Sequence, residues 1–301
     1  MAKHLPIVRL RKIWYVISII LVGGSIALVA IRGIPLGIDF VGGTLQKISF
    51  EGERPQPDAL AESINGLVGE ATVQPTGERE ALLRYRTVEQ ATRQSVIDTL
   101  TEQYGTIEEE SFETIGPTIG KELRQKAVWA VLLVVAAIIA YLTYVFRKVS
   151  KPIQSWKYGV LAIVTLLHDV TVVLGFYAVM NLFFEVELNS LFVIAMLTTL
   201  GYSVHDTIVV FDRTRSNVLE LGPEQFDKAV DLATNQTIGR SVNTSLTTIV
   251  PLAALLLFGG DTLFNFVAAL LAGVVVGTYS SLFISSPLLV TWHRFNERRN
   301  K

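Results

Sequence analysis

Residues 127–146 read AVWAVLLVVAAIIAYLTYVF, an apolar run of twenty residues without a charged side chain. A helix of this length rises about 30 Å, which is the thickness of the hydrocarbon core of a bilayer. Five more runs are long and apolar enough to do the same: Ile13 to Ile31, Tyr158 to Met180, Leu188 to Phe211, Val242 to Phe258 and Leu263 to Thr291. The last run is longer than one span and is expected to include an interfacial end. The sequence therefore predicts an α-helical polytopic membrane protein with six transmembrane helices.

The composition of the chain agrees with this class and excludes others. Half of its 301 residues are hydrophobic and its mean hydropathy is +0.44, more than a soluble domain with 18% charged residues needs to fill its core. The chain contains no cysteine, which excludes disulfides and thiolate metal sites. Its net charge of -1 supplies no basic face of the kind that a nucleic-acid-binding protein needs.

Lysines and arginines in the short segments predict the orientation, because such segments stay preferentially in the cytoplasm. Four segments are basic, with Lys3, Arg9, Arg11 and Lys12; Arg147, Lys148, Lys151 and Lys157; Arg213, Arg215, Lys228 and Arg240; and Arg294, Arg298, Arg299 and Lys301. The loops Asn181 to Glu187 and Gly259 to Asp261 have none and are expected outside. Both termini are therefore predicted to be cytoplasmic. The first run is longer than a usual signal-peptide core, so we expect a retained helix.

The segment between the first two helices, residues 33–126, is predicted to be a folded extracytoplasmic domain. Strand-like and helix-like patterns follow each other along it: Thr44 to Phe50, Pro57 to Leu67, Ala71 to Gln74, Ala81 to Arg86, Glu89 to Tyr104 and Thr106 to Thr114. Their order, βαββαβ, is that of a small α+β ferredoxin-like domain. The predicted organisation is a tail and first helix over residues 1–32, this domain, helices two to six over residues 127–291, and a cytoplasmic tail over residues 292–301.

Polar side chains inside the predicted spans are informative, because each costs free energy in lipid and usually faces protein or water. On the fourth span, Thr199, Ser203 and Asp206 fall at i, i+4 and i+7 and share one face. On the fifth span, one face carries Arg240, Thr244, Thr247 and Pro251, with Asn243 alongside. We expect the two stripes to face each other and Asp206 to pair with Arg240. Such a pair serves ion passage or, in the plainer interpretation, holds the bundle together.

The third span carries His168 and Asp169 near its middle, with Thr165 one turn away. Two interpretations stay open for them: an internal hydrogen-bonded pair that fixes helix packing, or a secondary member of an ion path. On the sixth span, Gly273 and Gly277 have the small-xxx-small spacing that lets two helices approach closely.

Four motifs together carry a resemblance to a known family. They are GIDFVGGT at residues 37–44, LHD at 167–169, GYSVHDTIVVFDR at 201–213 and RSVNTS at 240–245. In this order they resemble the SecD/SecF family of protein-export membrane proteins, within the resistance-nodulation-division superfamily. Two positions depart from the family pattern: Val41 replaces the usual Thr, and His205 stands where Asn is usual. A titratable neighbour bears on the protonation of Asp206.

The resemblance implies a SecF-type function and a set of partners. Such a chain pairs with SecD into a pseudo-symmetric unit with twice as many helices and assists the SecYEG translocon in moving unfolded secretory polypeptide, with YajC and YidC as further candidate partners. It is a transport subunit of the bacterial inner membrane and not an enzyme, and it uses the proton gradient, with protons as coupling ion and no cofactor. The family's functional aspartate and arginine map onto Asp206 and Arg240, and we place Ser203, Thr244 and His205 in the same proton pathway.

Two other classes of function stay open. A half-size exporter of the same superfamily would share the polar stripes, although such exporters normally carry two large outer domains. A structural assembly subunit would share the topology without needing charge at Asp206 or Arg240. Charge-neutral substitutions at these two positions therefore separate a motor from a scaffold.

Overall fold

The computed structural model describes residues 5–146, 154–184 and 186–299 of the chain. The chain divides into two compact units. The first comprises Met1–Pro35, Trp129–Glu187 and Leu191–Lys301, and the second comprises Leu36–Val128 with Leu188–Ser190. Some of the basic residues that predict the orientation lie outside the described ranges: Lys3, Arg147, Lys148, Lys151 and Lys301.

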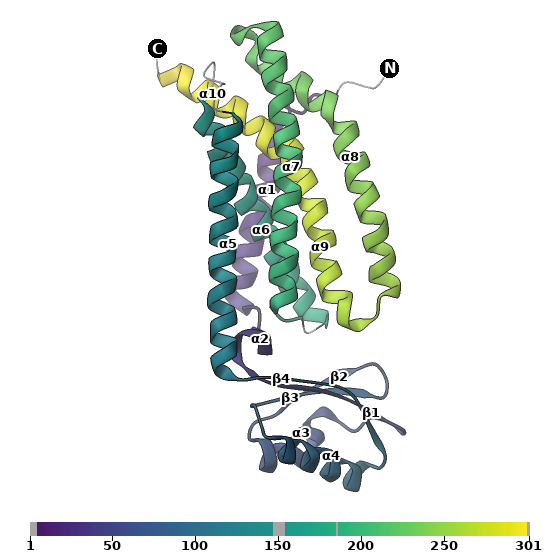
Figure 1. Cartoon of the computed structure of the whole chain (residues 1–301). Coiled ribbons are helices and arrows are strands. Elements are labelled where there is room, and N and C mark those ends of the chain that lie inside the picture. Colours follow the sequence, from purple (N-terminus) through teal and green to yellow (C-terminus); the bar gives the residue numbers. More distant parts are fainter. Residues whose placement is uncertain (1–4, 147–153, 185, 300–301) are drawn as a thin grey trace. The chain divides into compact units, whose positions relative to one another are not determined.

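Six helical stretches of the described chain are long and apolar enough to cross a membrane, which confirms the predicted number (Figure 1). They are α1 (Arg11–Arg32), α5 (Pro117–Val145), α6 (Ser155–Phe184), α7 (Ser190–Leu221), α8 (Phe226–Phe258), and α9 (Asp261–Ser280), which continues through the π-helical segment η2 (Ser281–Ser285) into α10 (Ser286–Arg299). A short 3₁₀ turn, η1 (Pro223–Gln225), separates α7 from α8.

Helices α7 and α8 extend far beyond the apolar runs that predict them. The fourth run ends at Phe211 but α7 continues to Leu221, and the fifth run begins at Val242 but α8 begins at Phe226. Hydropathy detects only the residues that favour lipid. Backbone hydrogen bonding continues a helix through amphipathic residues as well, so the helices exceed the predicted spans.

The interior of the membrane unit is formed mainly by α6, α7 and the α9–α10 stretch, whereas α1, α5 and α8 are mostly exposed in the single chain. Small residues of α9 let it approach α7 closely. A Cβ atom at Gly273 would lie 2.2 Å from Thr199 Cγ2, and one at Gly277 would lie 3.0 Å from Ser203 Cβ. These contacts confirm the packing function predicted for the two glycines.

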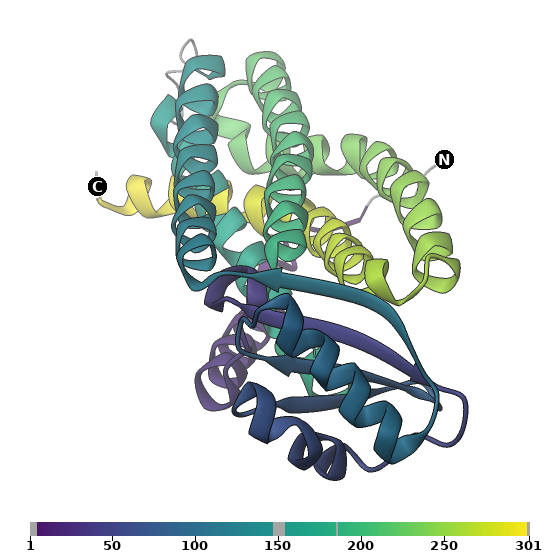
Figure 2. The ribbon, with the colours of Figure 1, turned by 60° about the horizontal axis from the view of Figure 1, so that its bottom comes forward.

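The second unit contains a four-stranded antiparallel sheet in the order β2-β3-β1-β4, with two helices on one face (Figure 2). Its elements are β1 (Gly43–Phe50), α3 (Pro57–Val68), β2 (Thr72–Thr76), β3 (Glu80–Tyr85), α4 (Gln90–Tyr104) and β4 (Ile107–Ile115). Alternate strand residues such as Ile48 and Leu83 are buried against Leu60 and Val96 of the helices. The predicted βαββαβ domain is confirmed, and the one-turn helix α2 (Ile38–Val41) was not predicted.

A polar network joins the helix side of this sheet to α4. The Arg93 guanidinium donates to both carboxylate oxygens of Glu109, which also accepts a 3.1 Å hydrogen bond from the Gln46 amide. Tyr85 donates its hydroxyl to Gln46 Oε1 at 2.6 Å. Burial raises the pKa of Tyr85 to about 12, and the negative charge of Glu109 adds to the rise.

The glycine-rich segment before β1 binds residues Leu188–Ser190 within the same unit. The Gly37 N–H donates to the Leu188 carbonyl at 2.7 Å, and Asp39 Oδ2 accepts a 2.7 Å hydrogen bond from the backbone N–H of Ser190. Ser190 is the first residue of α7, whose first N–H groups have no partner inside the helix. A Cβ at Gly37 would lie 3.1 Å from Asn189 Cβ, so a glycine suits this close approach.

Candidate functional site

Asp206 of α7 is a buried carboxylate with unfilled hydrogen-bonding capacity. Its side chain is almost fully enclosed, and its Oδ2 atom makes no hydrogen bond to any described residue. Oδ1 lies 4.0 Å from Nδ1 of the exposed His205. Ser241 of α8 lies beside the carboxylate, but its buried hydroxyl falls short of hydrogen-bonding geometry. The arrangement leaves Asp206 able to take up a proton or to bind a donor supplied from outside this chain.

Arg240, the predicted partner of Asp206, is exposed on α8. It lines a polar cleft of about 390 Å³ together with Asp212 and Arg213. Within the described ranges, no hydrogen bond or ion pair joins Arg240 to Asp206, although the charge of the guanidinium acts on the carboxylate across a longer distance. The pairing of the two residues therefore stays a prediction.

The polar stripe of the fifth span does not face the stripe of α7 as we expected. Arg240, Asn243 and Thr247 are exposed and Thr244 is half-buried, whereas Ser241 and Ser245 are buried. Helical spacing shows that residues share a face but not which neighbour that face meets. Thr244, which we placed in the proton pathway, accordingly makes no hydrogen bond to Asp206 within the described residues, and Ser241 is the α8 residue beside the carboxylate.

Ser203, which we placed in the proton pathway with Asp206, is hydrogen-bonded to a different carboxylate. Its hydroxyl donates to Asp169 Oδ2 at 2.6 Å and not to Asp206. The two α7 residues are three positions apart, so their side chains diverge by about 60° around the helix axis. Because Gly277 admits Ser203 against α9, the hydroxyl lies on the side of α7 where Asp169 of α6 can accept it.

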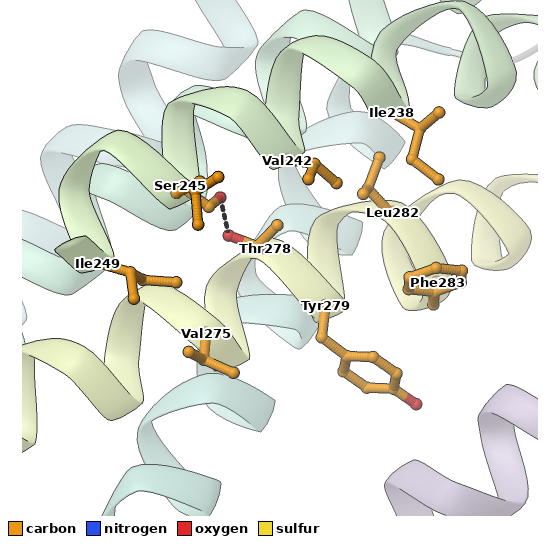
Figure 3. Close-up of a pocket in the computed structure, with 10 residues that line it drawn as sticks. Ile238, Val242, Ser245, Ile249, Val275, Thr278, Tyr279, Leu282 and Phe283 are labelled. Atoms are coloured by element: carbon orange, nitrogen blue, oxygen red, sulfur yellow. Dashed lines mark hydrogen bonds between the residues drawn. The ribbon is translucent and has the colours of Figure 1, made fainter. Parts of the chain in front are cut away.

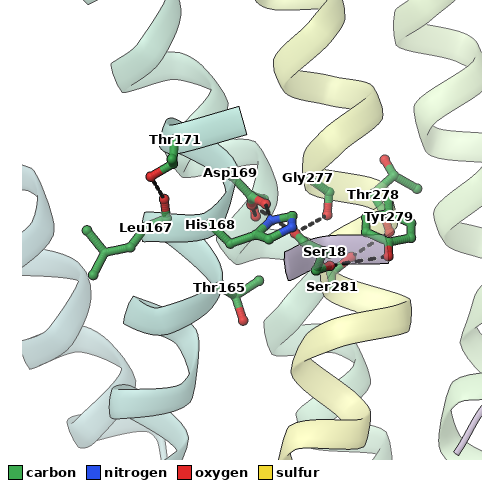
Figure 4. A network of polar contacts seen from close by, with 12 residues as sticks. Ser18, Thr165, Leu167, His168, Asp169, Thr171, Gly277, Thr278, Tyr279 and Ser281 are labelled. Atoms are coloured by element: carbon green, nitrogen blue, oxygen red, sulfur yellow. Dashed lines mark hydrogen bonds and ion pairs between the residues drawn. The ribbon is translucent and has the colours of Figure 1, made fainter. Parts of the chain in front are cut away.

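Asp169 is thereby the centre of a buried polar cluster that joins three helices (Figure 4). Its Oδ2 atom accepts hydrogen bonds from Ser203 of α7 and, at 2.9 Å, from Ser280 of α9. Its Oδ1 atom is hydrogen-bonded to His168 Nδ1 at 2.9 Å. His168 is 8% exposed, and its other ring nitrogen, Nε2, is buried without a hydrogen bond to any described residue. The hydrogen bond between His168 and Asp169 is observed, and it agrees with both interpretations left open for the pair.

Ser280 belongs to a set of serines that the sequence analysis missed. It directly precedes η2, and four serines around this segment are fully buried: Ser280, Ser281, Ser285 and Ser286. Single π-helical turns inside helices are frequent at functional sites, because they re-aim side chains. Two Ser-Ser pairs inside an apolar span were a visible signal, since polar residues in lipid usually face protein.

A second chain of hydroxyls joins α7, α8 and α9. Tyr202 donates to Ser245 at 3.0 Å, and Ser245 is hydrogen-bonded to Thr278 at 2.5 Å (Figure 3). Beside the contact between Ser245 and Thr278, α8 and the α9–η2 stretch border an apolar groove of about 310 Å³. Its lining is nearly all hydrocarbon, as expected of a surface that faces lipid or another helix.

The chemistry of these sites is that of proton and hydrogen-bond exchange. The part of the chain that the structure describes contains no group of three or more His, Asp or Glu side chains suited to a metal ion. It contains two buried carboxylates in spanning helices, with serines and a histidine as neighbours. Ionisable groups in such positions are typical of ion and substrate pathways. The fold and the sites define a polytopic membrane transport protein with a ferredoxin-like domain.

The chain belongs to the SecD/SecF family of protein export membrane proteins. The family model for the SecD/SecF C-terminal region matches residues 95–295, and the model for the SecD/SecF GG motif matches residues 27–51. Protein translocase subunit SecF of Thermobaculum terrenum is 40% identical over 96% of this chain and 94% of that protein. The subunit of the same name from Pseudomonas aeruginosa is 33% identical over 93% of this chain and 89% of its own length.

Solved structures agree with the family. The crystal structure of SecDF, a translocon-associated membrane protein from Thermus thermophilus, matches 97% of this chain with a TM-score of 0.84 and 31% identity. A super-membrane-facing form of SecDF matches the whole chain with a TM-score of 0.71. This chain spans 39% of the length of the first of those chains. It therefore corresponds to part of that longer SecDF chain.

Proposed function

We propose that this chain is the SecF-type half of a membrane complex that uses the proton gradient to drive protein export. The observation that carries the proposal is the buried Asp206 carboxylate, which lies within the GYSVHDTIVVFDR motif and has a free Oδ2 atom. An ionised carboxylate at the centre of a bilayer costs about 2.5 to 3.5 kcal/mol on insertion scales. The uncompensated group is therefore suited to bind and release a proton.

Arg240 is the proposed charge partner of the ionised form. An arginine keeps its proton at all accessible pH values, so the aspartate is the member of the pair that switches. The cleft that Arg240 lines contains Asp212 and Arg213 and gives a polar approach to this part of α7 and α8. Proton uptake by Asp206 weakens its attraction to Arg240, which lets α7 and α8 shift. One elementary charge that crosses 100 mV supplies about 2.3 kcal/mol for such a shift.

The exposed polar face of α8 is the proposed contact with SecD. Arg240, Asn243 and Thr247 lie on this face and would otherwise meet lipid, where polar groups are costly. A second half-bundle would cover them. The Sec translocon, SecYEG, is a further proposed partner, which the similarity to the translocon-associated SecDF supports. Unfolded secretory polypeptide, YajC and YidC are proposed as well.

We propose that the protein is located in the bacterial inner membrane, with both termini in the cytoplasm and the ferredoxin-like domain on the outer side. The chain contains no cysteine, so single cysteines report their side without background. Cysteines at Gly77 and Asn300 should react with an impermeant maleimide only from opposite sides of the membrane. Labelling of both from one side would overturn this orientation.

The central test is Asp206→Asn, which mimics the protonated form. It should leave the chain folded, inserted and bound to SecD, but abolish proton-dependent secretion of a reporter. Glu220→Gln is a matched control, because it removes an exposed carboxylate from the same helix. Arg240→Lys should keep part of the activity, since the charge remains but the forked geometry is lost.

The alternative of a structural assembly subunit predicts a different result. Secretion at the wild-type rate by Asp206→Asn, at equal protein level and with the gradient intact, would favour it and refute the proposed function. Failure of the chain to co-purify with SecD would instead favour a half-size exporter.

A further inference from the structure

The Asp169 cluster contains a buried ring nitrogen that no contact explains. Three hydrogen bonds converge on the Asp169 carboxylate, from His168 Nδ1, Ser203 and Ser280. Among the described residues, His168 is the one ionisable group that interacts electrostatically with the Asp169 carboxylate. His168 Nε2 lies on the far side of the imidazole ring, buried and without a hydrogen-bond partner in the described chain.

A count of protons shows what this arrangement lacks. An ionised carboxylate only accepts hydrogen bonds; the two serine hydroxyls donate to Asp169, and with the Nδ1–H tautomer of His168 three donors match the charged form of the carboxylate. A neutral His168 that donates through Nδ1 keeps a lone pair on Nε2, and the cluster then holds one uncompensated negative charge. An uncompensated charge in a spanning helix is costly. One proton on Nε2 makes the cluster neutral and leaves all three hydrogen bonds in place.

The surroundings of His168 are mainly apolar and contain a few hydroxyl groups. His168 borders a groove of about 590 Å³ whose lining is nearly all hydrocarbon, with Tyr15 and Ser18 of α1 and Thr171 of α6 as its hydroxyl-bearing members. Tyr279 of α9 lies on the same side, with its ring centroid 6.1 Å from that of His168, and its hydroxyl is hydrogen-bonded to Ser18. Of the described titratable residues, Tyr15 and Tyr279 also lie on this side of His168. Neither carries a charge near neutral pH.

We propose that His168 Nε2 is a second proton-binding atom of the bundle, distinct from Asp206, and that Asp169 and its two serines sense its charge. Protonation turns the Nδ1 contact into a charged hydrogen bond, so the contact of α6 with α7 and α9 through the carboxylate changes with the charge of His168. Ser203 and Asp206 lie on one helix, so both proton sites act on α7. The use of this proton in export rests on the proposed function, but its binding does not.

The experiment is a pH titration of the histidine ring nitrogens by NMR. The chain is labelled with ¹⁵N-histidine and reconstituted in nanodiscs with unlabelled SecD. It holds four histidines, and the signal missing from His168→Asn identifies His168. On acidification the Nε2 signal should move from a lone-pair to an N–H position. Asp169→Asn should change this response, because the negative charge that faces the ring is gone.

Matched variants separate this site from the site at Asp206. His205→Asn removes an exposed histidine next to Asp206 and should leave the His168 titration unchanged. His168→Asn keeps an N–H near the Nδ1 position but cannot take up a proton, so export should lose part of its dependence on outside pH, the part due to Asp206 remaining, while the protein folds normally. An Nε2 signal that stays constant over the whole pH range would overturn the proposal and leave a packing contact. If His168 takes up a proton but Asp206→Asn exports normally, the proposed function is refuted and the proton site at His168 still stands.

Discussion

Helices α1 and α6 touch at a point that leaves no space for a side chain, and this contact makes a sharp prediction. A Cβ atom at Gly175 of α6 would lie 2.0 Å from Ser25 Oγ, 2.3 Å from Ser25 Cβ and 2.8 Å from Ser25 Cα. Non-bonded carbon atoms pack best at about 3.5–4.0 Å. Gly175→Ala should therefore force the two helices about 1 Å apart.

The magnitude follows from two opposing effects. Overpacking of a close contact costs about 1–3 kcal/mol. Replacing glycine by alanine inside a helix gains about 0.5–1 kcal/mol. The free energy of unfolding should fall by about 1 kcal/mol, within a range of about 0–2.5 kcal/mol, because the strain outweighs the gain in helix propensity.

Reversible unfolding of the full chain by a denaturing detergent measures this change. Gly23→Ala is the matched control: Gly23 lies on α1, a Cβ there meets no atom within 4 Å, and the substitution should be neutral or stabilising. Adding Ser25→Gly to Gly175→Ala removes two of the three close atoms and should recover part of the loss. Equal unfolding midpoints for Gly175→Ala and Gly23→Ala would refute the tight contact.

Three further predictions concern the second unit. Tyr85→Phe leaves Gln46 Oε1 buried without its 2.6 Å donor and should cost about 1–3 kcal/mol, seen as faster amide exchange in β1 and β3. The pKa of Tyr85 is raised from 10.0 to about 12 in the folded protein. Its contribution to stability is therefore complete below pH 10.0 and is lost as the pH rises through about 12. Phenolate absorbance, with Tyr85→Phe as the reference, should show Tyr85 ionising near this higher pH. Asp39→Ala removes the acceptor of the Ser190 N–H and should speed amide exchange in the first turn of α7 by the equivalent of about 0.5–2 kcal/mol, whereas Asp39→Asn should have a smaller effect.

The sequence by itself determined the elements of this protein, because their signals are local. An uncharged run such as residues 127–146 has to become a helix in lipid, since no water is available to its backbone. Alternating residues such as Ile48 and Phe50 predict a strand for the same kind of reason, because one face of the sheet is buried. Asp206, His168 and Asp169 could be singled out as well, since charge in a span is unusual wherever its partners lie.

Only the tertiary structure decided which polar groups meet. The partner of Ser203 is Asp169, 34 residues earlier, and Asp169 also binds Ser280, 111 residues later. Periodicity places residues on a common face, but the rotation and approach of whole helices select the face that each one meets. The close approach of α9 at Gly277 directs Ser203 to Asp169 and leaves Asp206 with a free oxygen, because a hydroxyl donates its single proton to the acceptor that packing brings within reach.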